Sequence, residues 1–253
     1  MYDGVACEAL ATSVRAPWIV HVADCTSTMD LAHHLASEGA AHGTVVVADT
    51  QRAGRGRSGK AWHSDRGTGV WVSVLLRHLS SAPVGLLSIR TGLALAQRLD
   101  AQTRAPVTLK WPNDLLLDGG KLAGILTEAR WRGDMMEWLV VGVGVNLTAP
   151  PPDASRPTAL RVATLSPSAR RAAVLTEVVH AISYAATRTG VLTGAECSEY
   201  AVRDAVAGRV IRAPLAGTVR GITPDGALVV QTADGERHAI AGSIEFDHPA
   251  PER

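Results

Sequence analysis

A loop rich in both glycine and positive charge occupies residues 48–62, ADTQRAGRGRSGKAW. Four cations fall within nine residues of it: Arg52, Arg55, Arg57 and Lys60. Guanidinium groups and closely approaching backbone amides are good donors to carboxylates and phosphates. A solvated basic loop and a nucleic-acid contact are alternatives, although Trp62 is the one aromatic side chain of this segment that could stack on a base. The composition of the loop therefore favours a small anionic ligand.

The same loop matches two phosphate-binding patterns by spacing. Gly54, Gly56 and Gly59 fit G-x-G-x-x-G. The loop also fits the Walker pattern, except that Ala61 stands where that pattern has Ser or Thr. Both patterns need a helix directly after the glycines, because the helix N-terminus holds the phosphate. Here a β pattern follows at 69–76, so we predict neither a P-loop nor a Rossmann turn.

A second group of reactive side chains lies in KWPNDLLLDGGKLAGIL, residues 110–126. Pro112 favours an extended backbone before it, which places Asp114 at a strand start. The sequence DGG at 118–120 predicts a tight turn, so Asp114 and Lys121 can approach each other on neighbouring strands. The carboxylate could bind magnesium, and the ammonium could neutralise a phosphate or a developing oxyanion. An ordinary ion pair at the surface, worth at most about 1 kcal/mol, is the alternative.

A third segment, GVGVN at 142–146, combines two glycines with a polar end. Glycines in a buried strand allow a ligand to approach the backbone closely. Asn146 can both donate and accept a hydrogen bond there. A β-bulge with a polar cap is the alternative.

Short apolar segments must position these residues. Strands are predicted at 18–24, 43–49, 69–76, 107–111, 137–147 and on both sides of the 118–120 turn. Helices are predicted from a Ser27–Asp30 capping box to Gly39, over 84–99 after Pro83, and over 170–188. The Pro-rich segment 148–157 is predicted to be a surface loop.

The composition of the chain changes near Gly208, where short alternating segments are separated by Pro-Asp-Gly and Asp-Gly turns. This pattern predicts a small all-β module of four or five strands. We therefore predict an α+β domain over residues 1–204, with a mixed sheet and flanking helices, and a small β-barrel over 205–253.

Bulk properties exclude several classes of protein. A net charge of +1, from 25 Lys and Arg against 24 Asp and Glu, provides no general attraction to DNA or membranes. Cys7, Cys25 and Cys197 are widely spaced, which fits a reducing compartment rather than a disulfide framework or a zinc site.

No apolar run approaches the about 20 residues of a membrane span, and the N-terminal segment lacks the features of a signal peptide. We expect a cytoplasmic protein without a membrane partner. Few residues precede the first predicted strand, so we also expect no N-terminal DNA-binding domain and no specific DNA binding.

In their order and spacing, these motifs resemble those of the biotin protein ligases. The resemblance runs from about Trp18 to Asn146, and the β-rich tail resembles the small C-terminal domain of that family. The matching segments are TSTMD (26–30), Gln51 with AGRGRSG (53–59), Trp62, KWPND (110–114), KLAGIL (121–126) and GVGVN (142–146). Lipoate ligases share the catalytic fold but not this set of motifs.

The resemblance implies a fold and a reaction. The expected fold is the biotin–lipoate ligase fold, which is similar to class II aminoacyl-tRNA synthetases, followed by an SH3-like barrel. The expected substrates are biotin and ATP with Mg²⁺, which give biotinyl-5'-AMP and pyrophosphate. A lysine on the biotin carboxyl carrier domain of a biotin-dependent carboxylase, such as an acyl-CoA or pyruvate carboxylase, then takes the biotinyl group and releases AMP. Whether the chain dimerises is left open.

The resemblance also assigns residues to biotin. Ser27, Thr28 and Gln51 are expected to meet its ureido ring, which offers two N–H donors and a carbonyl. Met29 stands where the family commonly has Asn, and its side chain cannot donate a hydrogen bond. Any side-chain contact expected from that position is therefore lost, although a backbone contact could persist.

A further set of residues is expected to meet the reacting groups. Gly54, Arg55, Gly56 and Arg57 are expected to wrap the carboxylate or its acyl phosphate as a mobile lid that orders on binding. Lys121 resembles the residue that touches the activated carbonyl and the phosphate oxygens. Arg57, Lys121 and Asp114 are thus the expected catalytic residues.

The remaining expected contacts are with the nucleotide and the pocket wall. Asp114 resembles the acid that orients magnesium or the ribose. Asn113 and Asn146 belong to the nucleotide side, and Trp62 to a hydrophobic wall. Two alternatives remain open: a lipoate or octanoate ligase of the same fold, and a biotin-binding regulatory module.

Overall fold

The computed structural model describes residues 1–77, 84–148, 165 and 170–247. Its helices are α1 (Cys7–Val14), α2 (Thr28–Ser37), α3 (Val84–Asp100), α4 (Arg171–Ala186) and α5 (Gly194–Arg203). The first sheet contains β1 (Ile19–Cys25), β2 (Val45–Gln51), β3 (Gly69–Leu76), β4 (Thr108–Lys110), β5 (Asp114–Leu117), β6 (Gly120–Arg132) and β7 (Met135–Asn146). The second sheet contains β8 (Val210–Ala213), β9 (Gly217–Ile222), β10 (Leu228–Thr232), β11 (Gly235–Ala239) and β12 (Glu245–Phe246).

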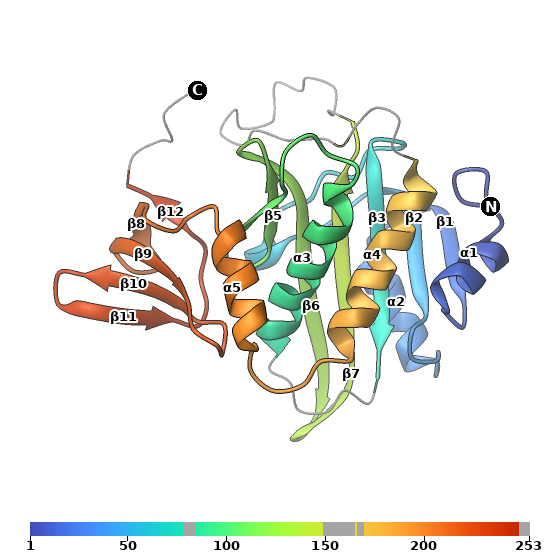
Figure 1. The fold of residues 1–253 in the computed structure, drawn as a ribbon. Coiled ribbons are helices and arrows are strands. Elements are labelled where there is room, and N and C mark those ends of the chain that lie inside the picture. Colours follow the sequence, from blue (N-terminus) through green and yellow to red (C-terminus); the bar gives the residue numbers. More distant parts are fainter. Residues whose placement is uncertain (78–83, 149–164, 166–169, 248–253) are drawn as a thin grey trace.

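The first sheet has seven strands in the order β1-β2-β3-β7-β6-β5-β4. β1 and β2 pair in parallel, whereas the other neighbouring strands pair antiparallel. The predicted mixed sheet is therefore confirmed. The long hairpin of β6 and β7 lies beside β3 near the middle of the sheet, and it carries the motif at 142–146 and the Lys121 end of the motif at 110–126 (Figure 1).

Helices cover both faces of this sheet. On one face, Met29 of α2 joins Val46, Leu75 and Val140 in a small apolar cluster. On the other face, α3 and α4 bury their apolar stripes in the main core, and both run across the front of the sheet in Figure 1. Both faces of β3 are thus covered, which explains why all of its residues are buried and its sequence is almost continuously apolar.

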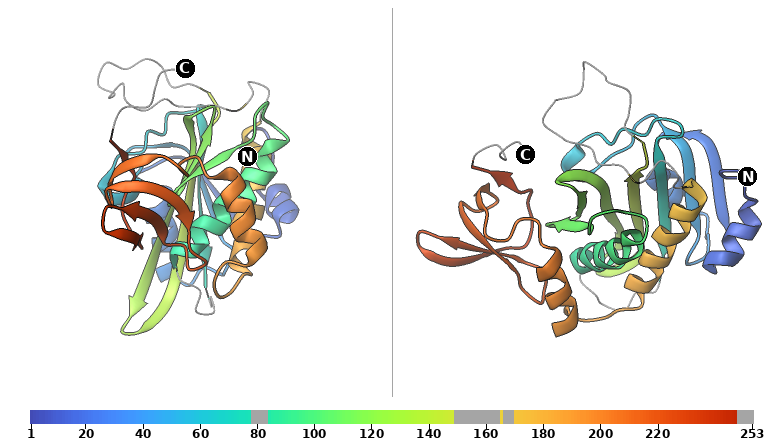
Figure 2. Two further views of the ribbon diagram at one scale, coloured as in Figure 1. Left: turned by 60° about the vertical axis from the view of Figure 1, so that its left-hand side comes forward. Right: turned by 45° about the horizontal axis from the view of Figure 1, so that its top comes forward.

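The second sheet is antiparallel, with the order β11-β10-β9-β8-β12. It lies at one end of the first sheet, next to α5 and far from α1 (Figure 1, Figure 2). Trp111 links the two sheets, because its indole N–H donates to the carbonyl of Gly226 at 3.0 Å. The predicted number of strands is confirmed, and the exact boundary at 204/205 stays a prediction.

Two helices were not predicted from the sequence. α1 is only eight residues long and buries two apolar residues, Leu10 and Val14. Two apolar positions are too few to show a helical period in the sequence. α5 begins with a capping box formed by Thr193 and Glu196, a T-x-x-E signal that was present in the sequence. Pro83 and the Pro-rich loop at 148–157 lie outside the described residues.

The start of α2 differs from its predicted capping box. Ser27 is the N-cap, and its side chain accepts from the Met29 backbone N–H at 3.3 Å, as expected for that position. The Asp30 carboxylate, however, accepts a hydrogen bond from Arg55 instead of closing the box. The physical reason is that an ion pair with a guanidinium from another segment satisfies this carboxylate better than a neutral amide does.

Among the helices that the structure describes, none has both the length and the apolar character that a membrane crossing requires.

Candidate active site

The basic glycine loop folds as an irregular β-hairpin, here called the glycine hairpin (residues 51–64). Backbone hydrogen bonds join its two arms from Gln51 and Ser64 at the base to Gly56 and Lys60 near the tip. The tip is a single 3₁₀ turn, Arg57–Gly59, after which the chain leads into β3. The prediction that no helix follows the glycines is therefore confirmed, and the loop is neither a P-loop nor a Rossmann turn.

The base of the glycine hairpin is tied to the turn between β1 and α2. The backbone N–H groups of Arg52 and Ala53 donate to the carbonyls of Cys25 and Thr26, both at 2.9 Å. Gly54 is required by close approach, because a Cβ there would lie 2.5 Å from the Trp62 carbonyl oxygen. Segments that are distant in sequence thus meet at one edge of the site.

Glycines of β6 and β7 form a flat surface under this edge, here called the glycine floor (Gly124, Gly142 and Gly144). Gly124 and Gly144 are direct partners in the β6–β7 register. A Cβ at Gly144 would lie 2.4 Å from the Trp62 ring, and one at Gly142 would lie 2.6 Å from the Met29 sulfur. The glycines therefore admit close neighbours, which in this structure are Trp62 and Met29, and the approach of a ligand to this backbone stays a prediction.

Trp62 combines several of the features expected of a pocket wall. Its ring packs edge-on against Trp71 with centroids 6.3 Å apart, and the Lys121 ammonium lies 5.1 Å from its ring centroid. Its indole N–H is buried and has no hydrogen-bond partner among the described residues. Leaving a buried donor unpaired costs about 1–3 kcal/mol, so the packing of this ring on the glycine floor is achieved at the expense of that hydrogen bond.

A chain of hydrogen bonds connects the predicted biotin-binding residues. The Gln51 side-chain oxygen accepts from the Thr28 backbone N–H at 2.8 Å and from its hydroxyl at 3.1 Å. The Thr28 and Ser73 hydroxyl oxygens are 2.8 Å apart. Because Thr28 has one hydroxyl proton and gives it to Gln51, Ser73 must be the donor in the second bond. Ser27 uses an oxygen lone pair in capping α2 and keeps its own proton for another acceptor.

Ser73 was missed by sequence reasoning. It is fully buried in the otherwise apolar strand β3, and a polar side chain in such a run usually has a partner. The signal was therefore its isolation in GVWVSVLL, but only the pairing of distant strands reveals that its partner is Thr28.

Asp114 and Lys121 form the ion pair that their spacing predicted. Their side-chain O and N atoms are 2.7 Å apart, at the start of the β5–β6 hairpin. Asn146 donates from its side chain to the Lys121 carbonyl at 3.0 Å, and Asn113 donates to the Ile125 carbonyl at 2.7 Å. Both asparagine side chains thus fix the backbone of β6 around Lys121, and their contact with a nucleotide stays a prediction.

Cations from several segments surround this ion pair. Burial lowers the pKa of the Lys110 ammonium, and its neighbouring charges are Asp114, Lys121, Lys60 and Arg209. Burial also lowers the pKa of Arg57, which the negative charge of Asp114 opposes. We call Arg57, Lys60, Lys110 and Lys121 the cation cluster. With the single negative charge of Asp114 it carries a net excess of positive charge, as an anion site requires.

The other arginines of the glycine hairpin point elsewhere. Arg52 is largely exposed and pairs with Asp24 on β1. Arg55 binds Glu128 and Asp30, so its predicted contact with the ligand carboxylate stays a prediction. The cation cluster thus takes Arg57 and Lys60 from this hairpin and adds Lys110, which the sequence analysis did not single out.

One carboxylate of the site is suited to magnesium. Within the described part of the chain, no three His, Cys, Asp or Glu side chains are grouped as a metal site would require. Magnesium is commonly held by one or two carboxylates together with substrate phosphates. Asp114, next to the cation cluster, fits that mode of binding.

Comparison with known proteins identifies the family. Residues 21–146 match the model of the biotin/lipoate A/B protein ligase family, and residues 209–247 match the biotin protein ligase C-terminal domain. This chain belongs to the biotin protein ligase family. The resemblance predicted from its motifs is confirmed, and the two matched regions fall in the two sheets described above.

Curated relatives of this ligase-family chain match somewhat more than half of it. A bifunctional ligase/repressor BirA of Bacillus subtilis is 38% identical over 147 residues, which are 57% of this chain and 45% of that protein. A biotin–[acetyl-CoA-carboxylase] ligase of Mycobacterium tuberculosis is 39% identical over 140 residues, 51% of this chain and 50% of that protein. The chain thus spans about half the length of the curated relatives it matches.

Solved structures of this family share the fold over most of the chain. The biotin protein ligase from Aquifex aeolicus in complex with biotin and ATP matches with a TM-score of 0.73 at 24% identity, over 90% of this chain and 97% of that one. The Leishmania major ligase in complex with biotinyl-5-AMP matches with a TM-score of 0.63 at 22% identity, over 89% and 99%. The predicted α+β architecture is thereby confirmed.

Proposed function

We propose that this protein is an ATP-dependent biotin protein ligase. It activates biotin as biotinyl-5'-AMP and transfers the biotinyl group to a lysine of a biotin carboxyl carrier domain. The observation that carries the proposal is the convergence of the cation cluster on Asp114 next to the Thr28–Gln51–Ser73 chain. One end of the site can bind a polar ring, and the other can bind concentrated negative charge.

The first step joins a carboxylate to a phosphate. A biotin carboxylate oxygen attacks the α-phosphorus of ATP, the bond from that phosphorus to the bridging oxygen breaks, and pyrophosphate leaves with the electron pair. Negative charge gathers on the phosphate oxygens in the transition state, where fixed cations stabilise it more than in the ground state. Arg57 and Lys121 fill this role, and Lys60 and Lys110 add to the field.

The second step transfers the acyl group. The neutral amine of the acceptor lysine attacks the acyl carbon, the bond to the AMP oxygen breaks, and the amine proton is lost to solvent. Lys121 faces the departing phosphate oxygens in this step as well. When Mg²⁺ is bound, it supplies further charge neutralisation. Asp114 and the substrate phosphates would hold it.

The proposed biotin end of the site is polar, because the side chains of Ser27, Thr28 and Gln51 gather there. Ser27 has a hydroxyl proton for the ureido carbonyl, while the side-chain oxygens of Gln51 and Thr28 are acceptors for the ring N–H groups. Met29 lies on Gly142 and supplies an apolar surface for the rest of the ring system. A lipoate or octanoate ligase would instead need an apolar channel at this position, which disfavours that alternative.

Further parts of the proposal concern the whole chain. We infer that the five-stranded second sheet is the SH3-like barrel of the family, and that the acceptor is the carrier domain of an acyl-CoA or pyruvate carboxylase. Three free cysteines are consistent with a reducing, cytoplasmic environment.

Mass spectrometry of a carrier domain tests the function directly. The domain is incubated with the protein, biotin and Mg-ATP, and the expected product carries one biotinyl group on a lysine. A parallel incubation replaces biotin with octanoate or lipoate, which should label the domain far more slowly. No labelling with biotin, or faster labelling with octanoate or lipoate, would overturn the proposal.

A further inference from the structure

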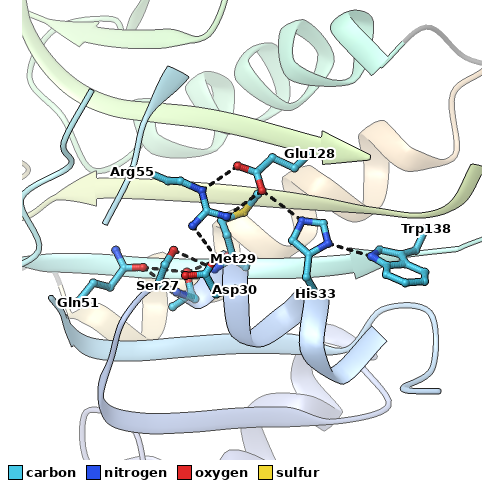
Figure 3. Close-up of polar contacts among 10 residues, drawn as sticks. Ser27, Met29, Asp30, His33, Gln51, Arg55, Glu128 and Trp138 are labelled. Atoms are coloured by element: carbon cyan, nitrogen blue, oxygen red, sulfur yellow. Dashed lines mark hydrogen bonds and ion pairs between the residues drawn. The ribbon is translucent and has the colours of Figure 1, made fainter. Parts of the chain in front are cut away.

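A polar network next to the glycine hairpin is not used by the chemistry above. Arg55 donates from Nε and Nη2 to the two carboxylate oxygens of Glu128 at 2.9 and 2.8 Å, a bidentate arrangement. Its Nη1 donates to the Asp30 carboxylate at 2.7 Å. We call these three residues the Arg55 clasp, which joins the hairpin to α2 and β6 (Figure 3).

Two further side chains hold Glu128 in place. The Trp138 indole N–H donates to Nδ1 of His33 at 2.9 Å, and Nε2 of His33 lies 3.2 Å from Glu128 (Figure 3). Because an indole N–H is a donor only, Nδ1 must be the accepting nitrogen and Nε2 carries the proton. His33 is thus fixed in the tautomer that donates to Glu128. Hydrogen bonds from His33 and Arg55 lower the pKa of this carboxyl to about 2.

The charges of the clasp argue against a role for Arg55 in binding an anion. One guanidinium faces two carboxylates, so the group is negative overall and repels a further carboxylate or phosphate. Arg57 differs, because its hydrogen-bond acceptor is the uncharged carbonyl of Gly242 at 3.2 Å. The two arginines of the GRGR motif therefore have different electrostatic surroundings.

The position of Arg55 in the hairpin suggests what the clasp does. Arg55 forms a β-bridge with Ala61, and the neighbouring pair, Gly54 and Trp62, is joined by a 2.8 Å backbone hydrogen bond. Fixing Arg55 therefore also fixes Trp62 above the glycine floor. Arg57 lies two residues further on, at the tip.

We propose that Arg55 is a positioning residue, which acts through Glu128 and Asp30 to hold the two arms of the glycine hairpin, next to its tip, over the glycine floor. The tip, with Arg57, then opens and closes over the acyl-adenylate while the arms stay fixed. This inference rests on the proposed function. It assigns the two arginines separate tasks: Arg55 anchors the hairpin and Arg57 contacts the intermediate.

The variant Glu128→Gln tests the clasp, because it keeps the size of the side chain and removes its charge. The full chain is loaded with biotin and Mg-ATP, and the escape of biotinyl-adenylate into solution is measured. We expect escape to rise about tenfold, which corresponds to the loss of one charged hydrogen bond. The rate of adenylate formation at saturating substrates should change little, since the cation cluster is intact.

The opposite result is expected if Arg55 binds the ligand carboxylate. Removing the charge of Glu128 would then free the guanidinium, and the adenylate would escape more slowly than from the unmodified protein. Unchanged or slower escape therefore overturns the inference. Arg55→Gln and the double variant complete a cycle, in which the double variant should match Arg55→Gln, because Glu128 acts on the hairpin through Arg55 and adds nothing once the guanidinium is gone. Arg55→Gln should release the adenylate at least as fast as Glu128→Gln, because it also loses the contact with Asp30.

Arg52→Gln is the matched control. It removes an ion pair of the same hairpin, with Asp24, that lies outside the clasp and is largely exposed. Its escape rate should equal that of the unmodified protein, and an increase equal to that of Glu128→Gln would count against a specific clasp. If Glu128→Gln does not fold, Asp30→Asn removes the more exposed arm of the clasp and should give a smaller increase; no increase would overturn the inference.

Limited proteolysis tests the clasp independently of ligase activity. Trypsin cleaves after Arg57 and Lys60 at the tip, and cleavage there should be several-fold faster in Glu128→Gln than in Arg52→Gln. Equal rates would overturn the positioning role. If the unmodified protein makes no biotinyl-adenylate, the proposed function fails, and the proteolysis result still decides whether the clasp holds the hairpin.

Discussion

At the scale of single residues, the site depends on where positive charge lies relative to the bond that changes. Lys121 lies 2.7 Å from Asp114 and faces the ring of Trp62, and the backbone at Lys121 is fixed by Asn146. An ammonium held in this way costs little reorganisation when charge develops on a phosphate oxygen. A residue that acts mainly on the transition state should affect rate more than binding.

Lys121→Ala should therefore lower the rate of adenylate formation by a factor of about 10²–10³, the usual effect of removing one such stabilising donor. Biotin affinity should change by less than about tenfold, because the ureido ring is bound by other side chains. Pyrophosphate exchange reports the rate, and calorimetry with biotin alone reports the affinity. Equal losses in the two measurements would contradict a transition-state role.

At the scale of elements, the glycine floor determines how closely other groups can approach the sheet. Gly124 and Gly144 pair across β6 and β7, and the Trp62 ring occupies the space above them. The glycines are thus needed for space, since a side chain at either position would push against an aromatic ring. This is a packing requirement of β6 and β7 together, not of either strand alone.

Gly144→Ala should lower the free energy of unfolding by roughly 1–3 kcal/mol, because its Cβ would lie 2.4 Å from the Trp62 ring. Displacing this ring should also change the intrinsic tryptophan fluorescence of the folded protein. Gly85→Ala in α3 is the matched control, since no atom lies within 4 Å of its Cβ and alanine favours a helix. Urea unfolding of both variants measures the difference, and similar destabilisation of the two would contradict the packing argument.

At the scale of the whole molecule, contacts between distant segments connect the two sheets with each other and α2 with the first sheet. Arg57 at the hairpin tip donates to Gly242, which follows β11, and Phe246 of β12 lies between Lys110 and Arg209. The Arg55 clasp connects α2 to β6 in the same way. The stability of the whole chain therefore depends on charged groups in the site.

Acid unfolding should report the clasp. The pKa of Glu128 falls from 4.5 to about 2 in the folded protein, through hydrogen bonds from His33 and Arg55. A lowered folded pKa contributes stability that is fully present above pH 4.5 and is lost as the pH falls toward 2. The unfolding free energy of Glu128→Gln should thus decline less steeply than that of the unmodified protein between pH 4.5 and 2. Parallel declines in urea titrations over this range would contradict the assignment.

Much of the architecture could be predicted because it is encoded locally. The strand from 69–76, the hairpin turn at 118–120 and the Ser27 N-cap each follow from neighbouring residue types. The Asp114–Lys121 pair is predictable for a related reason: the tight turn brings the two strands together, and the long Lys121 side chain reaches Asp114 although the register places that residue opposite Gly124. The motifs themselves indicated the family that the comparisons confirmed.

Other features could not be predicted, because their partners are far apart in the chain. Ser73 meets Thr28 across 45 residues, Arg55 meets Glu128 across 73, and Arg57 meets Gly242 across 185. No local pattern encodes such pairs, and a one-residue change in strand register would separate them. The prediction of a complete capping box at Asp30 was wrong for this reason, because its carboxylate binds a guanidinium supplied by another segment.

The sequence by itself determined most of the strands, the three longer predicted helices, the order of the motifs and the chemistry that their side chains can perform. Only the tertiary structure decided which arginine of the glycine hairpin faces the cation cluster and which one faces two carboxylates. The physical reason is that residue type determines which groups a charged side chain can bind. The packing of β6, α2 and the glycine hairpin determines which of those groups lies within hydrogen-bond distance.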